Sequence, residues 1–353
     1  MHIELQHINK SFGSFQASKD ISFGIEQGKL VALLGPSGSG KTTILRMIAG
    51  LEHQDSGDIY IQGKKMNSVP VCDRGIGFVF QNYALFPYYT VFDNIAYGLK
   101  LRKMNKVQIK ERVEELLELV GLKNLGDRYP DQLSGGQRQR VAFARALAPK
   151  PNVLLLDEPF AAIDAKVRQE LRSWLRDMIH KIGITSIFVT HDQEEAVEVA
   201  DEIIITNHGR VEQKGSPKEI YRNPKTPFTA RFMGHSLIIP DFGRLHGFRH
   251  DETYQKAVIR PEFVKVVKMN HAKYKNSAYE NGRIRDISFR GSAYRLTVEV
   301  GEILLQTTRT LDQEPVTVGE EVKVLIYQLY AFNESKVELI QNSALQEGEM
   351  YYI

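Results

Sequence analysis

The sequence predicts an α/β doubly wound fold over residues 1–235, followed by a small all-β barrel of the OB type over residues 236–353. In the first part, short apolar runs alternate with helical patterns, and such runs suit strands that are buried on both faces of a parallel sheet. Prolines then punctuate the chain around residues 217–227. Beyond about residue 259 the segments alternate apolar and polar residues, as half-buried strands do.

The elements of the first part follow in chain order. Two strand-like segments, IELQHI and DIYIQG, are expected to form an antiparallel side sheet. The predicted buried strands are KLVALLG, PNVLLLDEP and TSIFVTHD. The predicted helices are TTILRMIAGL, KVQIKERVEELLELVGL, GQRQRVAFARAL and AKVRQELRSWLRDMIHKIG. In the second part, VIRPEFVKVVK, GRIRDISFRGSAYRLTVEV, EILLQTTRT and EEVKVLIY are predicted to be strands.

Composition excludes several classes of protein. The chain of 353 residues, 42% apolar and 25% charged, resembles an ordinary globular protein of two or more domains. No window reaches the roughly 18 consecutive apolar residues of a membrane span, and the strand-like N-terminus is not expected to be a secretion signal. Cys72 is the single cysteine and has no internal disulfide partner, which favours the cytosol. A net charge of +3 is too small to indicate nucleic-acid binding.

The segment GPSGSGKTT matches the P-loop pattern G-x-x-x-x-G-K-[ST]. Because it follows a predicted buried strand and opens a helix, backbone N–H groups there are expected to surround phosphates. Lys41 is expected to neutralise the phosphates of ATP, and the Thr42 hydroxyl to bind Mg²⁺. The predicted nucleotide-binding residues are Gly35, Pro36, Ser37, Gly38, Ser39, Gly40, Lys41, Thr42 and Thr43. A glycine-rich turn that binds nothing is the alternative.

Two carboxylates end the predicted strand VLLLDEP. Asp157 is expected to hold Mg²⁺, because it ends a buried strand beside the P-loop strand. Glu158 is expected to polarise the attacking water as a general base. The alternative for both is an acidic turn that caps a helix.

Three further residues each have two interpretations. His191 follows the strand-like TSIFVT and is either a catalytic residue or a capping or core residue. Gln81 either completes the Mg²⁺ shell or is a loop residue. Phe12 either stacks on adenine or belongs to the core.

The segment LSGGQRQRVAFARAL contains a second glycine-rich helix start. Ser134, Gly135 and Gly136 precede a helical pattern of arginine and apolar residues, which is typical of an anion-binding helix N-terminus. A chain with a P-loop already has one such turn, so the motif by itself does not explain why there are two.

The motifs together resemble the ATP-binding cassette (ABC) ATPases. GPSGSGKT, FQNYALFP, LSGGQRQRVAFARAL, VLLLDEP and VTHDQEEA occur in the order and spacing of that family, over the first 235 residues. The resemblance implies a RecA-like P-loop ATPase core with an antiparallel β subdomain and a helical subdomain, the helical one over about residues 84–150. It also implies that two ATPase units pack head to tail, each ATP lying between the P-loop of one and the signature helix of the other.

The resemblance also implies residue roles. Phe12 matches the adenine-stacking aromatic residue, Gln81 the Q-loop glutamine, Asp157 the Walker B aspartate, and Glu158 and His191 the catalytic glutamate and switch histidine. The signature residues, which would act on the partner's nucleotide, are Ser134, Gly135, Gly136 and Gln137. Asp164 matches the D-loop aspartate. It follows Ala161-Ala162-Ile163 here, where the family usually has Ser-Ala-Leu.

The same resemblance implies partners. A chain with one P-loop and one signature motif is expected to form a homodimer or to pair with a similar subunit. The aromatic-rich segment NYALFPYYTVFDNIAYGL either packs inside the helical subdomain or forms the cleft that receives a coupling helix of a membrane permease. Two permease subunits, and indirectly an extracytoplasmic solute-binding protein, would then be partners at the cytoplasmic face of the membrane.

The second part resembles the TOBE-type regulatory domain of importer ATPases, with VIRPE at its expected place. The segment AKVRQELRSWLRDMIHKIGITSIFVTHDQEEAVEVADEI looks most like that of sulfate/thiosulfate import ATPases. Importers of molybdate, iron, polyamines or sugars remain alternatives, as do a soluble ABC switch ATPase acting on nucleic acid and a regulatory module whose barrel binds a ligand. No nucleic-acid partner is expected.

Overall fold

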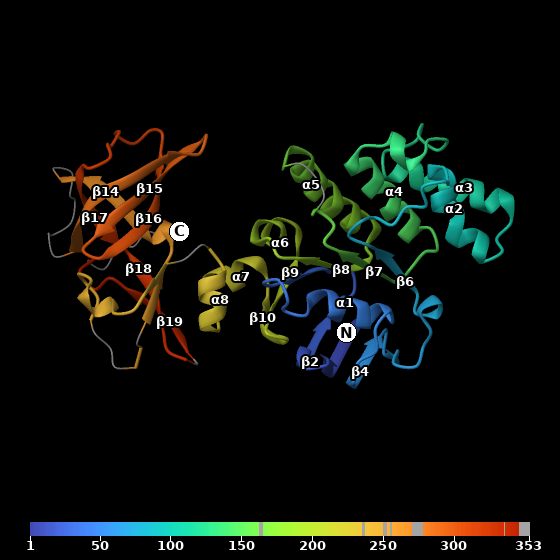
Figure 1. Ribbon diagram of the computed structural model, residues 1–353, viewed down its shortest axis with the longest axis horizontal. Helices are drawn as coiled ribbons and strands as arrows, with labels where there is room; N and C mark the ends of the chain where they lie inside the picture. Colours follow the sequence, from blue (N-terminus) through green and yellow to red (C-terminus); the bar gives the residue numbers. More distant parts are fainter. Residues whose placement is uncertain are drawn as a thin grey trace. The chain divides into compact units, whose positions relative to one another are not determined.

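The computed structural model describes residues 1–161, 165–234, 237–249, 253–254, 256–269, 278–334 and 336–345. The chain divides into two compact units, Met1–Lys218 and Glu219–Ile353 (Figure 1). This division falls earlier than the expected boundary near residue 235. The side chain of Arg260 explains the difference, because it donates to the carbonyl of Tyr221 and stacks on the Tyr221 ring, 4.1 Å from its centroid, so this part of the chain packs with the second unit.

A six-stranded sheet forms the centre of the first unit, in the order β10-β9-β3-β8-β7-β6. Its strands are β3 (Leu30–Leu34), β6 (Ile76–Val79), β7 (Val153–Asp157), β8 (Thr185–Thr190), β9 (Glu202–Asn207) and β10 (Arg210–Gly215). All neighbours pair in parallel except β10, which is antiparallel to β9. Every residue of β3 and β8 is buried, as the continuous apolar runs predict for a sheet covered on both faces.

The predicted antiparallel side sheet is confirmed, with the strand order β2-β1-β4-β5. It contains β1 (Ile3–Phe12), β2 (Phe15–Ile25), β4 (Ser56–Ile61) and β5 (Lys64–Lys65). Apolar side chains of this sheet and of the parallel sheet share one core with helix α1 (Lys41–Ala49). The P-loop helix is therefore packed between two sheets.

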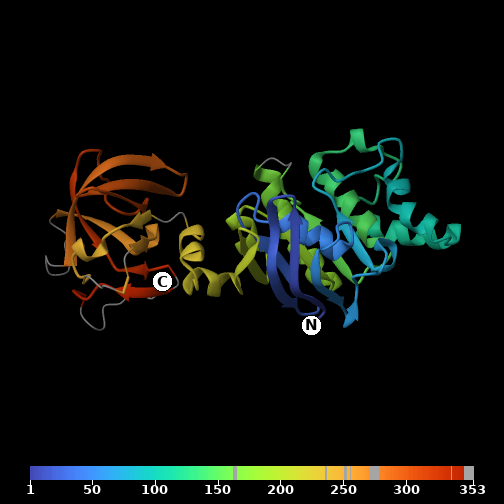
Figure 2. The ribbon, with the colours of Figure 1, turned by 60° about the horizontal axis from the view of Figure 1, so that its bottom comes forward.

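Helices surround the parallel sheet. The described helices of the first unit are α1, α2 (Val91–Leu101), α3 (Lys106–Leu119), α4 (Gly135–Leu147), α5 (Ala165–Ile182) and α6 (Gln193–Val199), and α7 (Pro217–Arg222) crosses the division. Helices α2, α3 and α4 gather at one end of the first unit, as the cyan and green ribbons show (Figures 1 and 2). They match the expected helical subdomain. Among the described residues, no helix is long and apolar enough to cross a lipid bilayer.

The second unit begins with the end of α7 and α8 (Pro227–Phe232) and continues as two antiparallel sheets, with strand orders β11-β12-β18-β19 and β13-β17-β14-β15-β16. Their strands are β11 (Leu237–Ile239), β12 (Lys256–Ile259), β13 (Val264–Lys268), β14 (Tyr279–Phe289), β15 (Ala293–Val300), β16 (Ile303–Thr310), β17 (Glu321–Ile326), β18 (Gln328–Phe332) and β19 (Val337–Gln341). Both sheets contribute to one apolar core. The predicted all-β second part is confirmed.

A buried arginine fixes the far end of the P-loop helix. The Arg74 side chain is 3% exposed and donates to the carbonyls of Met47 and Ile48, both at 2.9 Å, and to the carbonyl of Val69 at 3.0 Å. Burial lowers the pKa of Arg74. Its charge lies at the C-terminus of α1, where a cation interacts favourably with unpaired carbonyl groups. Arg74 therefore ties α1 to the segment that leads into β6.

Replacing Arg74 with methionine, which has a similar length but no donors, should lower the free energy of unfolding of the first unit by about 2 kcal/mol. Urea unfolding followed by the fluorescence of Trp174, the single tryptophan of the chain, measures this change. The control is Arg210→Met at an exposed position of β10. Equal effects of the two substitutions would contradict a special role for Arg74.

Candidate nucleotide site

The carboxyl ends of three parallel strands meet at one edge of the sheet. Gly35 follows β3, Asp157 ends β7 and His191 follows β8. In the strand register, Leu34 pairs with Thr190 and Asp157 pairs with Val189. In open α/β sheets, ligands bind at this edge. Residues far apart in the sequence are thus brought to one place.

The P-loop has a backbone path that requires glycine. Gly38 and Gly40 have φ values of 78° and 92°. A Cβ on Gly35 would lie 2.2 Å from the carbonyl oxygen of Thr206, and one on Gly40 would lie 2.0 Å from that of Ala17. Gly40 is the N-cap of α1, so the unpaired N–H groups of the first helical turn face the loop. This turn has the shape that binds phosphate through backbone amides.

The ammonium group of Lys41 is held inside the P-loop. Lys41 is 6% exposed, and its Nζ donates to the carbonyls of Gly35 at 2.9 Å and Pro36 at 2.8 Å. Burial lowers the pKa of Lys41, and the charges of Glu158 and Asp157 oppose this shift. A buried cation that contacts only neutral acceptors fits an anionic ligand in the loop.

Thr42 and Asp157 form the oxygen-rich side of the site. The Thr42 hydroxyl donates to the Asp157 carboxylate at 3.0 Å. Burial raises the pKa of Asp157, while the hydrogen bond from Thr42 lowers it. A hydroxyl and a carboxylate are ligands that Mg²⁺ prefers, so these two residues fit such an ion.

Glu158 joins the two loops predicted to act with it. Gln81, which follows β6, donates through Nε2 to Glu158 Oε2 at 3.0 Å, and His191 Nδ1 lies 3.6 Å from Glu158 Oε1. The side chain of Glu158 is 24% exposed. Its backbone has a φ of 43°, in a region that glutamate rarely adopts. Such strained residues cluster at functional sites, because the surrounding structure must hold them there.

Sequence reasoning missed the ion network that positions His191. Arg172 on α5 is 8% exposed and lies 3.6 Å from Asp192, 3.6 Å from Glu195 and 3.2 Å from Glu198. Thr190 donates to Glu195, whose pKa is raised by burial. The signal in the sequence was the acidic run after His191, which needs a cationic partner when α6 packs on α5.

The remaining predicted residues lie apart from this group of side chains. Phe12 ends β1 and is 46% exposed, with Lys10 Nζ 5.0 Å from its ring centroid, so a stacking role stays a prediction. Ser134 caps α4, because its hydroxyl accepts from the N–H of Gln137 at 3.3 Å and the Gln137 side chain accepts from the N–H of Ser134 at 2.9 Å. Gly135 and Gly136 form the first turn of this helix. Asp164 lies outside the described residues.

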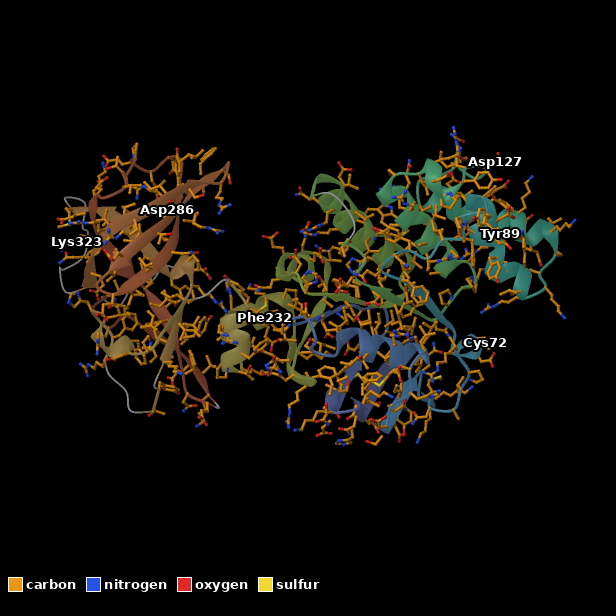
Figure 3. The ribbon with its side chains drawn as sticks, viewed as in Figure 1. Cys72, Tyr89, Asp127, Phe232, Asp286 and Lys323 are labelled. Carbon is orange, nitrogen blue, oxygen red and sulfur yellow. The ribbon has the colours of Figure 1, made fainter. Side chains whose placement is uncertain are left out.

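The aromatic-rich segment after Gln81 is fixed by hydrogen bonds to its backbone, and some of its aromatic side chains are exposed. Arg145 donates to the carbonyls of Tyr83 and Ala84, both at 2.7 Å, and buried Asn94 bonds the backbone of Phe86. Tyr88 and Tyr89 of this segment are 90% and 42% exposed, and Phe80, which directly precedes Gln81, is 40% exposed. Tyr89 is labelled in Figure 3. We call these three residues the aromatic surface. Part of the segment therefore packs inside, and part faces outward.

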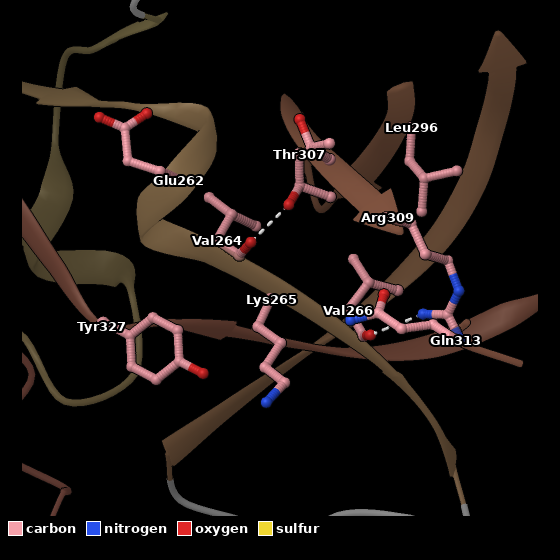
Figure 4. Close-up of a pocket in the computed structure, with 10 residues that line it drawn as sticks. Glu262, Val264, Lys265, Val266, Leu296, Thr307, Arg309, Gln313 and Tyr327 are labelled. Carbon is pink, nitrogen blue, oxygen red and sulfur yellow. Dashed lines mark hydrogen bonds between the residues drawn. The ribbon is translucent and has the colours of Figure 1, made fainter. Parts of the chain in front are cut away.

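The second unit contains a cavity of about 220 Å³ (Figure 4). Two of the polar side chains that line it form hydrogen bonds to the protein's own backbone. Arg309 donates to the carbonyl of Val266 at 3.0 Å and Thr307 donates to that of Val264. These bonds tie β16 to β13, so the polar groups have a structural explanation.

Family models match both units. The model of the ABC transporter family matches residues 18–161, and that of the TOBE domain matches residues 257–326. A sulfate/thiosulfate import ATP-binding protein of Synechococcus elongatus is 58% identical over 267 residues, covering 75% of this chain and 77% of the relative. A protein of the same name from Neisseria meningitidis serogroup B is 45% identical over 363 residues, covering 97% of this chain and 100% of the relative.

Solved structures are similar to the first unit. The dimeric ATP-binding cassette MJ0796 in a post-hydrolysis state, bound to ADP and Pi, is 33% identical, with a TM-score of 0.54 over 61% of this chain and 98% of that one. The cbiO1 protein of Clostridium perfringens, part of the ABC transporter complex cbiONQ, is 31% identical, with a TM-score of 0.59 over 63% of this chain and 91% of that one.

Replacing Asp157 with asparagine should raise the melting temperature of the ligand-free protein by a few degrees at neutral pH. Burial raises the pKa of Asp157, so its charge disfavours the folded state wherever the carboxyl is ionised. Below the pKa of the unfolded chain the carboxyl is protonated in both states, and the advantage of the variant should disappear. Thermal unfolding of both proteins from about pH 3 to pH 8 measures this, because an unperturbed aspartate has a pKa of about 3.9.

Asparagine keeps the acceptor for the Thr42 hydroxyl, so the change isolates the charge. The matched control is Asp127→Asn at an exposed position (Figure 3). A variant with the same or a lower melting temperature at neutral pH would show that the Asp157 charge is not destabilising.

Proposed function

The chain belongs to the ABC transporter ATPases, and from that premise we propose that it is the ATP-hydrolysing subunit of an importer for sulfate or thiosulfate. The solute is supported by the relatives, since a sulfate/thiosulfate import ATP-binding protein is similar to this chain over 97% of its length. The ATPase chemistry is supported by the convergence of Lys41, Asp157 and Glu158 at one edge of the sheet. Importers of molybdate, iron, polyamines or sugars are the alternatives.

Nucleotide binding is assigned to the P-loop. The N–H groups of residues 37–43 surround the phosphates of ATP, and Lys41 exchanges its contacts with the carbonyls of Gly35 and Pro36 for phosphate oxygens. Phe12, which is exposed at the end of β1, stacks on the adenine ring. Thr42 and Asp157, with Gln81, hold Mg²⁺. When bound, this ion neutralises charge on the phosphate oxygens.

Hydrolysis is assigned to Glu158 and His191. The Glu158 carboxylate accepts a proton from water as the water oxygen bonds to the γ-phosphorus, and the bond from phosphorus to the oxygen of ADP breaks. The proton then leaves Glu158 with the products. The amide of Gln81 and the ring of His191, which contact the two oxygens of this carboxylate, hold it in position and turn toward water and γ-phosphate when ATP is bound.

The signature helix acts on a partner's nucleotide. The hydroxyl of Ser134 and the first N–H groups of α4 form an anion-binding helix start like that of α1. In a two-fold dimer, this start closes over the nucleotide in the P-loop of the other subunit. The structure of MJ0796 with ADP and Pi is described as dimeric, which supports this assembly. The two glycine-rich turns of one chain then serve two different nucleotides.

Membrane coupling is assigned to the aromatic surface. Phe80 directly precedes Gln81, and Tyr88 and Tyr89 follow it closely in the chain, so a helix of a permease subunit seated on them is linked to the catalytic loop. The subunit is then peripheral, at the cytoplasmic face of the membrane. It works with two permease subunits, and a solute-binding protein on the other side acts through them.

Mixed dimers test the shared sites. When one protomer carries Ser134→Arg and the other Lys41→Ala, one composite site keeps both an intact P-loop and an intact signature turn. The other site has lost both. We expect such dimers to bind about one ATP at high affinity and to retain part of the wild-type activity, whereas homodimers of either variant lose nearly all of it. Tandem-tagged purification and ATP titration measure this.

Two intact sites in the mixed dimer, or none, would contradict the shared arrangement. Dimers that carry both substitutions in one protomer are the matched control. In these, each site has lost one of its two halves, so the activity should fall to that of the homodimeric variants.

Sulfate uptake tests the solute. Deleting the gene from its own genome should abolish uptake of radiolabelled sulfate, and the wild-type gene should restore it. Glu158→Gln should lower ATP hydrolysis by roughly 10² to 10⁴-fold, because the base is removed, and should not restore uptake. Loss of molybdate, iron, polyamine or maltose uptake with sulfate uptake intact would overturn the solute. If the deletion affects the uptake of none of these solutes and RNA or DNA stimulates the ATPase activity, the result would favour a soluble switch protein.

A further inference from the structure

We propose that a groove at the opposite edge of the parallel sheet is a second ligand site of the first unit, for a small organic anion with an apolar body. The groove has a volume of about 500 Å³, within the range of small-molecule sites. Residues just before the starts of β7 and β8 line the groove, whereas the nucleotide site lies at the ends of these strands. The proposal is therefore independent of the ATPase assignment.

Three parts of the first unit form the walls of this groove. His2, which precedes the first strand of the side sheet, lines one wall. The helical subdomain contributes Leu116 and Leu119 of α3, and the chain around β7 and β8 contributes Lys150 and Lys181. Two further hollows adjoin it, one sharing Lys150 and the other sharing His2. A ligand here would contact the sheets and the helical subdomain at once.

The charges of the groove favour an anion. Arg112 is neutralised by Glu115 at 2.8 Å, and its other donors reach the carbonyls of Leu147 and Ala148 at the end of α4. In the described part of the chain, Lys150 and Lys181 have no hydrogen bond or ion pair from their side chains, and both are exposed. The groove thus presents two uncompensated positive charges to a ligand.

A buried histidine supplies an unused polar atom. His2 is 7% exposed, and its Nε2 has no hydrogen-bond partner in the described structure. Burial lowers the pKa of His2, and a bond to the backbone of Asn152 opposes that shift. A neutral ring whose N–H donates to the backbone of Asn152 leaves Nε2 as an acceptor. Buried polar atoms are nearly always paired, so this nitrogen indicates a donor in the groove, either a water that bridges to the anion or a hydroxyl of the ligand.

The groove also has an apolar wall and a strained backbone. Leu116, Leu119 and Ile184 line it, with Leu119 partly exposed and the other two buried, and such side chains suit an aromatic or aliphatic body rather than an inorganic ion. Lys150 has a φ of 54°, which is uncommon for a residue other than glycine or asparagine. Lys150 lies in the short connection between the end of α4 and the start of β7.

The groove lies at the far end of the helix that begins at Ser134. Helix α4 runs from the signature turn to Leu147, which lines the groove. A ligand that holds α3 and the end of α4 against the sheet is placed to influence the position of the signature turn.

Calorimetric titration of the full chain with 1-naphthalenesulfonate tests the proposal. We expect one saturable site, weaker binding of methanesulfonate, which lacks the apolar body, and weaker binding of 1-naphthalenemethanol, which lacks the charge. Lys150→Glu with Lys181→Glu should weaken binding of 1-naphthalenesulfonate about tenfold or more. Leu119→Asp should weaken it as well. Melting temperatures and ATPase rates of the variants verify that they are folded.

The matched control is Lys64→Glu with Lys106→Glu, which makes the same charge change outside the groove and should leave the affinity unchanged. Lys41→Ala should also bind normally. Loss of binding in that variant would locate the probe in the P-loop and overturn the proposal. So would equal effects of the two lysine pairs, or no saturable binding of 1-naphthalenesulfonate, 1-naphthyl phosphate and salicylate.

Discussion

The parallel pairing of β3, β8 and β7 is the constraint on which the candidate site depends. Because the three strands run in the same direction in a fixed register, the residues that follow them emerge together, although more than a hundred positions separate Gly35 from Asp157 in the sequence. A shift of one residue in β7 would turn the Asp157 side chain to the opposite face of the sheet. The continuous burial of these strands fixes that register, so the core and the chemistry depend on the same contacts.

The charges at this edge are unfavourable without a ligand. Burial lowers the pKa of Lys41 and raises that of Asp157, so each group is held where its charged form is disfavoured. The P-loop carbonyls and the Thr42 hydroxyl compensate in part. A bound phosphate and a cation would compensate for both groups at once, which is why stability and ligand affinity are opposed at Asp157.

Local sequence predicted much of this structure. The fold class, the side sheet and the P-loop turn follow from hydrophobic periodicity and from glycines whose spacing has few alternatives. Helix α2 was not predicted, because its aromatic residues concealed the helical pattern, and neither was the hairpin of β9 and β10. The buried partners Arg74 and Arg172 were also missed. Their roles depend on helices and loops that meet only in the folded chain, so no spacing in the sequence reports them.

The two ends of α4 show why a helix of this kind can connect distant sites. Its N-terminus is held by the capping box of Ser134. Arg145, near its other end, holds the backbone that leads from Gln81 to the two tyrosines of the aromatic surface. The carbonyls of Leu147, its last residue, and of Ala148 accept hydrogen bonds from Arg112 of α3. A displacement of α3 must therefore either break the Arg112 contacts or carry α4 with it. Since burying an unpaired guanidinium or carbonyl costs more than moving a rigid helix slightly, the second outcome is favoured. The helical subdomain then moves as one body between the catalytic loop and the signature turn.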